Sequence, residues 1–130
     1  MVEKSLSGQQ ILVVEDDPFI LSYLKVLLAS LDYSFTALSD GRDAVRLLTS
    51  DGHFNLLFTD IRLGGEMDGF TVARMAHSLR PEMGVLFTSG SLYHTEQFYA
   101  VTPQFRGFIR KPYRKKELDD AIQLALAPQG

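Results

Sequence analysis

Short apolar runs alternate with longer amphipathic segments along the whole chain. The first run, Ile-Leu-Val-Val at residues 11–14, is too short for a helix and is β-branched, which indicates a buried strand. Comparable runs predict further strands at 33–38, 54–59, 85–87 and 107–109. Apolar residues recur at helical spacing between these runs, which predicts helices over 18–31, 41–48, 69–80, 92–100 and 113–126.

Capping residues mark where three of these helices begin. Asp17 precedes Pro18, a residue suited to the first turn of a helix, and Asp40 and Asp68 precede the next two helices. The helix at 92–100 has the weakest periodicity. Because a helix follows every strand, the order is βα repeated five times. This order predicts an α/β fold with a doubly wound parallel sheet, helices covering both of its faces.

The composition narrows the class of protein. The chain has 130 residues, which suggests a single domain over 1–130, with a core at about 10–127 and a tail at 1–9. It has no cysteine, which excludes disulfides and thiolate metal sites, and its net charge of −3 argues against general nucleic-acid binding. We find no signal sequence and no membrane span, so we expect a cytoplasmic domain that binds no membrane.

Polar side chains stand at the carboxyl ends of four predicted strands. Glu15 and Asp16 follow the first strand, Asp60 follows the third, Thr88 closes the fourth and Lys111 follows the fifth. The carboxyl ends of parallel strands lie along one edge of a sheet, where ligands bind. We therefore expect these carboxylates, the hydroxyl and the ammonium to form a site for a divalent cation and a phosphoryl group.

Each of these residues also has a purely structural interpretation. Asp60 is a candidate nucleophile, because a carboxylate can accept a phosphoryl group as an acyl phosphate, but it could also cap a turn. Glu15 and Asp16 suit Mg²⁺, whose charge would relieve their repulsion, but they could also cap a helix. Thr88 is a common strand residue, and a lone lysine is usually solvated. We expect the bond from Lys111 to the following proline to be cis, which would turn the ammonium toward the site.

At these positions the chain resembles the receiver domain of bacterial two-component response regulators. The resemblance spans about residues 11–126 and is carried by VVEDDP at 13–18, TDIR at 59–62, MDG at 67–69, FTSG at 87–90 and GFIRKP at 107–112. Each motif alone is weak, but all of them in order at the spacing of the family are specific. The resemblance implies a flavodoxin-like receiver fold with strand order 2-1-3-4-5.

The resemblance also implies a role for each acidic residue. Asp60 corresponds to the phosphoacceptor of the family. Asp16 would bind Mg²⁺ directly and Glu15 through water. Asp60 and the backbone carbonyl of Arg62 would be further ligands of the same cation.

Three further positions correspond to groups that hold the phosphoryl group or respond to it in the family. Thr88 and Lys111 would hold the phosphoryl group, and Phe108 occupies the aromatic switch position, whose rotamer follows the threonine. The protein would then be a switch that catalyses only its own phosphorylation and dephosphorylation. Its phosphodonor would be a sensor histidine kinase or a histidine phosphotransfer protein.

The chain departs from the family pattern in several places. The loop LGGEM at 63–67 lacks the usual proline and is one residue longer. Arg62 is large and cationic, and its side chain either reaches over the phosphoryl group or points to solvent. Ser89 stands where the family prefers Ala or Gly. Phe108 has no hydroxyl, so its switch would rest on packing alone.

Two other functions compete with a stand-alone receiver. A small aspartyl-phosphate hydrolase would have a similar site, but such enzymes usually place a second acid two residues after the nucleophile, where this chain has Arg62. A receiver fold could also serve as an interaction scaffold that is never phosphorylated, although the intact acidic, Thr and Lys set argues against this.

For a stand-alone receiver, the signal must leave through the surface of the domain itself. We expect this surface to combine the weak helix at 92–100, the strand that carries Phe108 and the basic residues at 110–116. Tyr93, Phe98 or Tyr99 would be exposed contacts for an unknown downstream protein. We expect the domain to be a monomer or a weak dimer.

Overall fold

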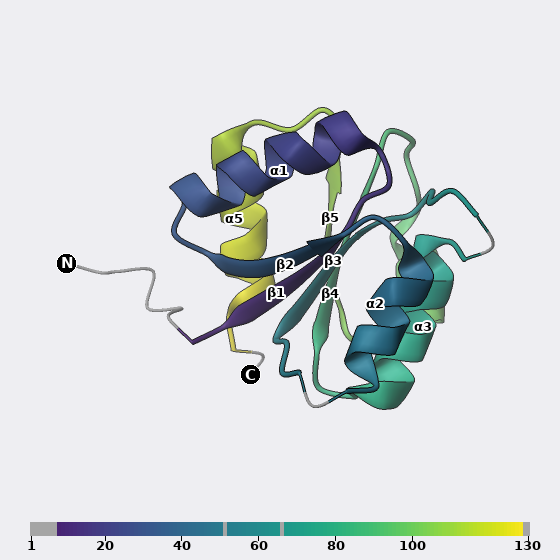
Figure 1. Ribbon diagram of the computed structural model, residues 1–130. Coiled ribbons are helices and arrows are strands. Elements are labelled where there is room, and N and C mark those ends of the chain that lie inside the picture. The colour runs from purple at the N-terminus through teal and green to yellow at the C-terminus, as the bar shows by residue number, and fades with distance from the viewer. Residues whose placement is uncertain (1–7, 51, 66, 129–130) are drawn as a thin grey trace.

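Strands and helices alternate throughout the computed structural model, which describes residues 8–50, 52–65 and 67–128 (Figure 1). The strands are β1 (Gln10–Val14), β2 (Ser34–Leu38), β3 (Leu56–Asp60), β4 (Gly84–Ser89) and β5 (Phe105–Arg110). The helices are α1 (Pro18–Ser30), α2 (Gly41–Leu48), α3 (Gly69–Leu79), α4 (Thr95–Val101) and α5 (Lys115–Leu126). The predicted alternation is confirmed. Most of the tail expected at 1–9 lies outside the described residues.

The strands form one parallel sheet, and its order β2-β1-β3-β4-β5 confirms the expected topology. The central strands β1 and β3 are apolar almost throughout and buried, as expected for a sheet covered on both faces. The strand order reverses between β1 and β3. This reversal places a crevice outside their carboxyl ends, which is where open α/β sheets bind ligands.

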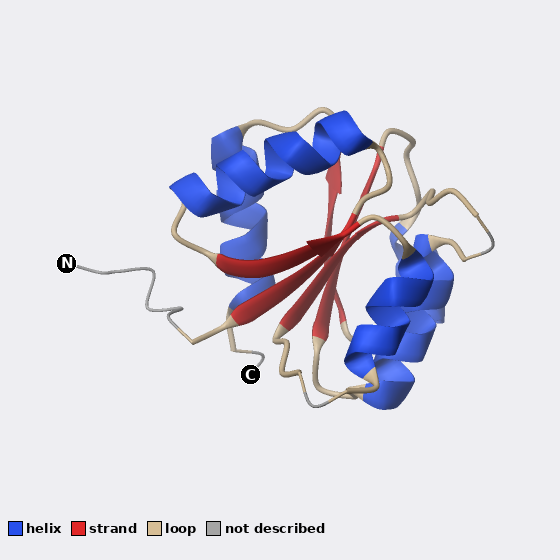
Figure 2. Cartoon of the chain, in the orientation of Figure 1, coloured by secondary structure: helices blue, strands red, loops and turns tan. Residues whose placement is uncertain are grey.

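Helices cover both faces of the sheet (Figure 2). Helices α1 and α5 pack on one face, where Leu28 and Ile122 belong to the same buried core. Helices α2, α3 and α4 pack on the other face, around a second core that contains Ala44, Val72 and Phe98. Among the helices of the described chain, none has both the length and the hydropathy needed to cross a bilayer.

The predicted capping residues begin the helices as expected. The Asp17 carboxylate accepts hydrogen bonds from the Phe19 and Ile20 N–H groups at the start of α1. Asp40 and Asp68 cap α2 and α3 in the same way. Because these caps satisfy N–H groups that have no partner within the helix, they define where each helix leaves the carboxyl edge of the sheet.

Helix α4 differs most from the sequence expectation. It begins at Thr95 rather than at residue 92, and Phe98 is only 2% exposed, so the prediction that Phe98 is an exposed contact is wrong. Phe98 is buried because its ring stacks on Phe105 and Phe108, at centroid distances of 4.7 and 5.2 Å. Tyr99, at 56% exposed, remains available at the surface.

These contacts belong to a continuous group of rings that joins α3, β4, α4 and β5. We call it the aromatic cluster, and it consists of Phe70, Phe87, Tyr93, Phe98, Tyr99, Phe105 and Phe108. Aromatic pairs in such tilted or offset arrangements contribute beyond the area that they bury. Ring packing therefore holds α4 in place, although its sequence has little helical periodicity.

The opposite edge of the sheet carries a cavity of about 460 Å³. It is lined by Gln9, just before β1, and by Leu126, Ala127 and Pro128 at the end of α5. The two ends of the described chain therefore meet at the amino-terminal edge of the sheet, away from the crevice.

Candidate functional site

Four strands each bring one polar side chain to the carboxyl edge of the sheet. Asp60 ends β3 and lies beside Thr88 of β4 in the strand register. Glu15 directly follows β1, the other neighbour of β3. Lys111 directly follows β5, and its backbone N–H donates to the Ser89 carbonyl at 2.9 Å. The sheet register alone therefore brings together the residues that the sequence places in the site.

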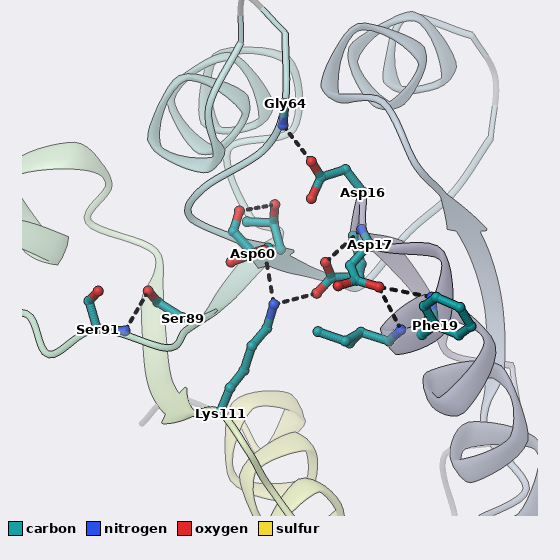
Figure 3. Close-up of polar contacts among 11 residues, drawn as sticks. Asp16, Asp17, Phe19, Asp60, Gly64, Ser89, Ser91 and Lys111 are labelled. Carbon is teal, nitrogen blue, oxygen red and sulfur yellow. Dashed lines mark hydrogen bonds and ion pairs between the residues drawn. The ribbon is translucent and has the colours of Figure 1, made fainter.

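Lys111 lies between two buried carboxylates (Figure 3). Its Nζ is 2.7 Å from Glu15 Oε1 and 2.9 Å from Asp60 Oδ2. The Glu15 and Asp60 side chains are only 1% and 7% exposed. The bond from Lys111 to Pro112 is cis, as predicted. The ammonium thus provides the charge partner that two carboxylates require when they are removed from water.

Burial and neighbouring charges shift the pKa values of Glu15 and Lys111. Burial, followed by the nearby charge of Asp60, raises the pKa of Glu15, against the opposing effects of Lys111 and the Asp17 N–H. Burial alone would lower the pKa of Lys111, but its hydrogen bonds to Glu15 and Asp60 and their charges outweigh burial and raise it. Lys111 is therefore held as a cation at neutral pH.

Glu15, Asp16 and Asp60 form an acidic cluster. Each residue offers an oxygen, and these oxygens lie within 4.8 Å of one another. One cation placed among them could contact all three, and an all-oxygen set suits Mg²⁺. The residues therefore fit the metal that the sequence predicts. Arg62 is exposed just beyond β3, and the role of its carbonyl as a further ligand stays a prediction.

Asp16 and Asp17 have separate roles despite being adjacent. Asp17 caps α1, whereas the exposed Asp16 accepts a hydrogen bond from the Gly64 N–H at 2.6 Å (Figure 3). Gly64 belongs to the loop between β3 and α3, so this hydrogen bond connects the loop to the acidic cluster.

Thr88 has a buried hydroxyl that is available to a ligand. Thr88 is 1% exposed, and its Oγ1 has no hydrogen-bond partner among the described residues. A buried polar group without a partner is costly, which is consistent with a hydroxyl that donates to a bound ligand. The neighbouring Ser89 is already engaged, since its Oγ accepts from the Ser91 N–H at 3.0 Å and closes the turn after β4 (Figure 3).

Phe108 lies in β5, the strand next to the one that carries Thr88. It is half-buried, stacks on Phe98 and lies edge-on to Tyr93 at a centroid distance of 6.3 Å. The ring therefore contacts α4 and the loop before it. Its role as a switch stays a prediction.

Sequence reasoning missed two glycines that shape the site. Gly69 begins α3, and its N–H donates to the Ile61 carbonyl at 2.7 Å, which presses the helix against the backbone that follows Asp60. Gly64 contacts Asp16 through its backbone. The sequence carried a signal for each: the MDG motif for Gly69 and the doubled glycine for Gly64.

Sequence and structure comparisons all point to one protein family. The sequence model of the response regulator receiver domain family matches residues 11–123. The response regulator receiver protein CpdR from Brucella abortus (strain 2308) is 29% identical, and the match covers 91% of this chain and 97% of CpdR. Other curated relatives are longer, and the chain spans 26% of one and 46% of another.

Solved structures share the fold. A response regulator receiver protein from Sinorhizobium medicae WSM419 matches with a TM-score of 0.79 at 27% identity, over 91% of this chain and 94% of that one. The receiver domain of sensor histidine kinase PA1611 from Pseudomonas aeruginosa PAO1 has the same TM-score of 0.79 at 23% identity, over 91% and 97% of the two chains. That structure has a magnesium ion coordinated in its active site cleft.

Proposed function

We propose, from the premise that this chain belongs to the response regulator receiver domain family, that it is a phosphorylation switch with Asp60 as its phosphoacceptor. Its phosphodonor is a phosphohistidine on a sensor histidine kinase or a histidine phosphotransfer protein. The phosphoryl group changes the surface that a downstream protein recognises. The receiver domain acts in the cytoplasm, as a monomer or weak dimer.

One observation carries this proposal. The carboxyl edge of the sheet, where open α/β folds bind ligands, brings four features together. They are Asp60, the rest of the acidic cluster, the Thr88 hydroxyl without a hydrogen-bond partner among the described residues, and the Lys111 ammonium. Phosphoryl transfer asks a protein mainly for positioning and for charge neutralisation, and this arrangement offers both.

The chemistry needs no general base, because Asp60 is already a carboxylate. A carboxylate oxygen attacks the phosphorus of the phosphohistidine, and the phosphorus–nitrogen bond breaks. The electron pair of that bond returns to the imidazole, and Asp60 becomes an acyl phosphate. Lys111, now 2.9 Å from Asp60 Oδ2, pairs with a phosphoryl oxygen, and the Thr88 hydroxyl donates to another.

The acidic cluster would hold the cation that this reaction requires. Asp16 and Asp60 would hold Mg²⁺ directly, Glu15 would hold it through water, and the Arg62 carbonyl would be a further ligand. The cation would supply positive charge beside the phosphoryl oxygens. The magnesium in the receiver of the PA1611 kinase supports this assignment. Because few protein ligands contribute, we expect modest affinity and no stable phosphorylation without the metal.

The decisive experiment is chemical labelling of Asp60. The protein is treated with acetyl phosphate and Mg²⁺, reduced with borohydride and mapped by mass spectrometry. We expect one modified residue, Asp60, and no stable mass gain in Asp60→Asn. Asp43→Asn is the matched control, since Asp43 is an exposed carboxylate of α2 paired with Arg46. Full labelling of Asp60→Asn would refute the proposal.

The same incubation separates the competing functions. A hydrolase would turn over acetyl phosphate continuously, and an interaction scaffold would gain no mass. No carboxylate stands two residues after Asp60, where Arg62 is exposed, which favours a switch over a hydrolase.

A further inference from the structure

We infer that Gly64 is a positioning residue, whose backbone N–H orients the Asp16 carboxylate toward the cation. The inference rests on the proposed function, because it concerns the same metal. Asp16 is the exposed member of the acidic cluster, and Glu15 and Asp60 are buried. Lys111 holds both buried members but is not paired with Asp16. Asp16 therefore depends on another group for its orientation.

Gly64 provides that group. Its N–H donates to Asp16 Oδ2 at 2.6 Å, and no other side-chain hydrogen bond or ion pair of Asp16 is found in the described chain. Figure 3 shows the Asp16 carboxylate between Gly64 and the rest of the site. A carboxylate has two oxygens and several lone pairs, so Oδ2 can accept from Gly64 while Oδ1 stays available to a cation.

The hydrogen bond to Asp16 also explains why residue 64 is a glycine. A Cβ at residue 64 would lie 3.0 Å from Asp16 Oδ2, closer than side-chain carbons usually approach another group. Gly65 differs, because its φ of +88° reverses the chain there, and a Cβ at residue 65 would meet nothing within 4 Å. The missing side chain at residue 64 thus allows the close approach to Asp16, whereas residue 65 needs glycine only for its own positive φ.

Groups that orient a metal ligand raise its affinity because they fix its geometry before the metal binds. An exposed aspartate would otherwise rotate among several rotamers, and metal binding would have to stop that motion. The Gly64 N–H stops it in advance. We therefore expect the loop at 63–67 to strengthen the binding of Mg²⁺, because its Gly64 N–H holds the Asp16 carboxylate.

The test measures Mg²⁺ affinity directly, by calorimetry or NMR titration, without any phosphodonor. Gly64→Ala pushes the carboxylate away, and we expect about tenfold weaker Mg²⁺ binding with an unchanged melting temperature in EDTA. Gly65→Ala is the matched control, since it strains the same loop without touching Asp16. We expect it to lower the melting temperature and to leave Mg²⁺ affinity within about twofold of the wild type.

The hydrogen bond itself has a signature that needs no metal. In EDTA, Asp16→Ala should shift the Gly64 amide proton upfield and speed its exchange with solvent. An unchanged Gly64 amide would overturn the inference, and so would a Gly64→Ala protein with wild-type or tighter affinity. Equal losses in both glycine variants would assign the effect to loop shape and also overturn it. A wild-type protein that binds no Mg²⁺ would instead overturn the metal site of the proposed function, and this inference with it.

Discussion

At the scale of single residues, the site depends on buried charges of opposite sign, those of Lys111 and of the carboxylates Glu15 and Asp60. Lys111 contacts Glu15 and Asp60 at once, and the two carboxylates have little water to shield them. Such a pair contributes little net stability when complete, but removing one partner leaves an uncompensated charge. The lysine therefore affects both the chemistry of the site and the stability of the fold.

Lys111→Met should destabilise the protein by about 3 kcal/mol in EDTA, because it leaves Glu15 and Asp60 facing each other without a counter-charge. Mg²⁺ should recover part of the loss, since the cation takes over that role. Urea unfolding with and without Mg²⁺ measures both effects. Lys116→Met, which breaks only an exposed pair with Asp120, should cost less than about 0.5 kcal/mol. Equal stability of Lys111→Met and the wild type in EDTA would contradict the prediction.

Gly69→Ala tests the close approach of α3 to the end of β3. A Cβ at residue 69 would collide with the Asp60 carbonyl oxygen and the Ile61 Cα, both of which are backbone atoms that cannot rotate away. We expect a loss of about 3 kcal/mol in the free energy of unfolding. At Gly90 a Cβ would meet nothing within 4 Å, so Gly90→Ala serves as the control and should unfold like the wild type.

At the scale of elements, the sequence predicted types and order better than boundaries. The strands β1 and β3 and the caps of α1, α2 and α3 were predictable, because hydrophobic runs and Asp caps act locally. Helix α4 and the length of β5 were not, because ring contacts between elements hold them, such as those of Phe98 with Phe70 and Phe105, and these contacts produce no periodic pattern in the sequence.

Some features of the candidate site were likewise predictable from the sequence, and others were not. The positions of Asp60, Thr88 and Lys111 were predictable because each residue stands at the carboxyl end of an apolar strand, and the parallel sheet aligns these ends. The hydrogen bond from Gly64 to Asp16 was not, because the doubled glycine indicates a loop but does not identify the partner of its amide, which is 48 residues away. The hydrogen bond from the Tyr33 hydroxyl to Asp119 Oδ1, at 2.6 Å, escaped for a similar reason.

That hydrogen bond ties the start of β2 to α5 and should make stability depend on pH. Burial, followed by the hydrogen bond and charge of Asp119, raises the pKa of Tyr33 above its ordinary value of 10.0. Folded Tyr33 therefore keeps its proton where unfolded Tyr33 loses it. Its stabilising contribution is complete below pH 10 and declines as the pH rises further.

We expect Tyr33→Phe to be less stable than the wild type by about 1 kcal/mol at neutral pH, with the difference shrinking above pH 10. Unfolding by urea at several pH values measures this, and comparison of the two proteins cancels the other titrating groups. Replacing the exposed Tyr99 by Phe is the control. A difference that grows with alkaline pH would be the wrong sign and would refute the assignment.

At the scale of the whole molecule, the aromatic cluster connects β4, the strand that carries Thr88, to the surface at α4. Phe70 follows Gly69 at the start of α3, and its ring contacts Phe87, Tyr93 and Phe98. Phe108 also contacts Phe98, and the exposed Tyr99 contacts Phe105. Packed rings have few alternative arrangements, so a displacement at Thr88 or Phe108 would be passed on to α4.

Beryllofluoride, which mimics the phosphoryl group, should therefore shift amide NMR resonances across 92–108 as well as in the site. The change can be only as large as the difference in free energy that the mimic supplies to the two states. Asp60→Asn should show no shifts. Changes confined to the residues around Asp60, with 92–108 unmoved, would mean that this surface does not carry the output.

The position of Gln9 and Pro128 beside one cavity has a practical consequence for protein engineering. Gln9 and Pro128 line that cavity at the amino-terminal edge of the sheet, and β1 spans 5 residues, or about 16 Å, from there to Glu15. A fluorescent label attached at Gln9 or Pro128 would therefore lie at the amino-terminal edge of the sheet, away from the acidic cluster. A short linker could also join these two positions, so that the chain could be opened beside α4 and the domain converted into a reporter of changes at that helix.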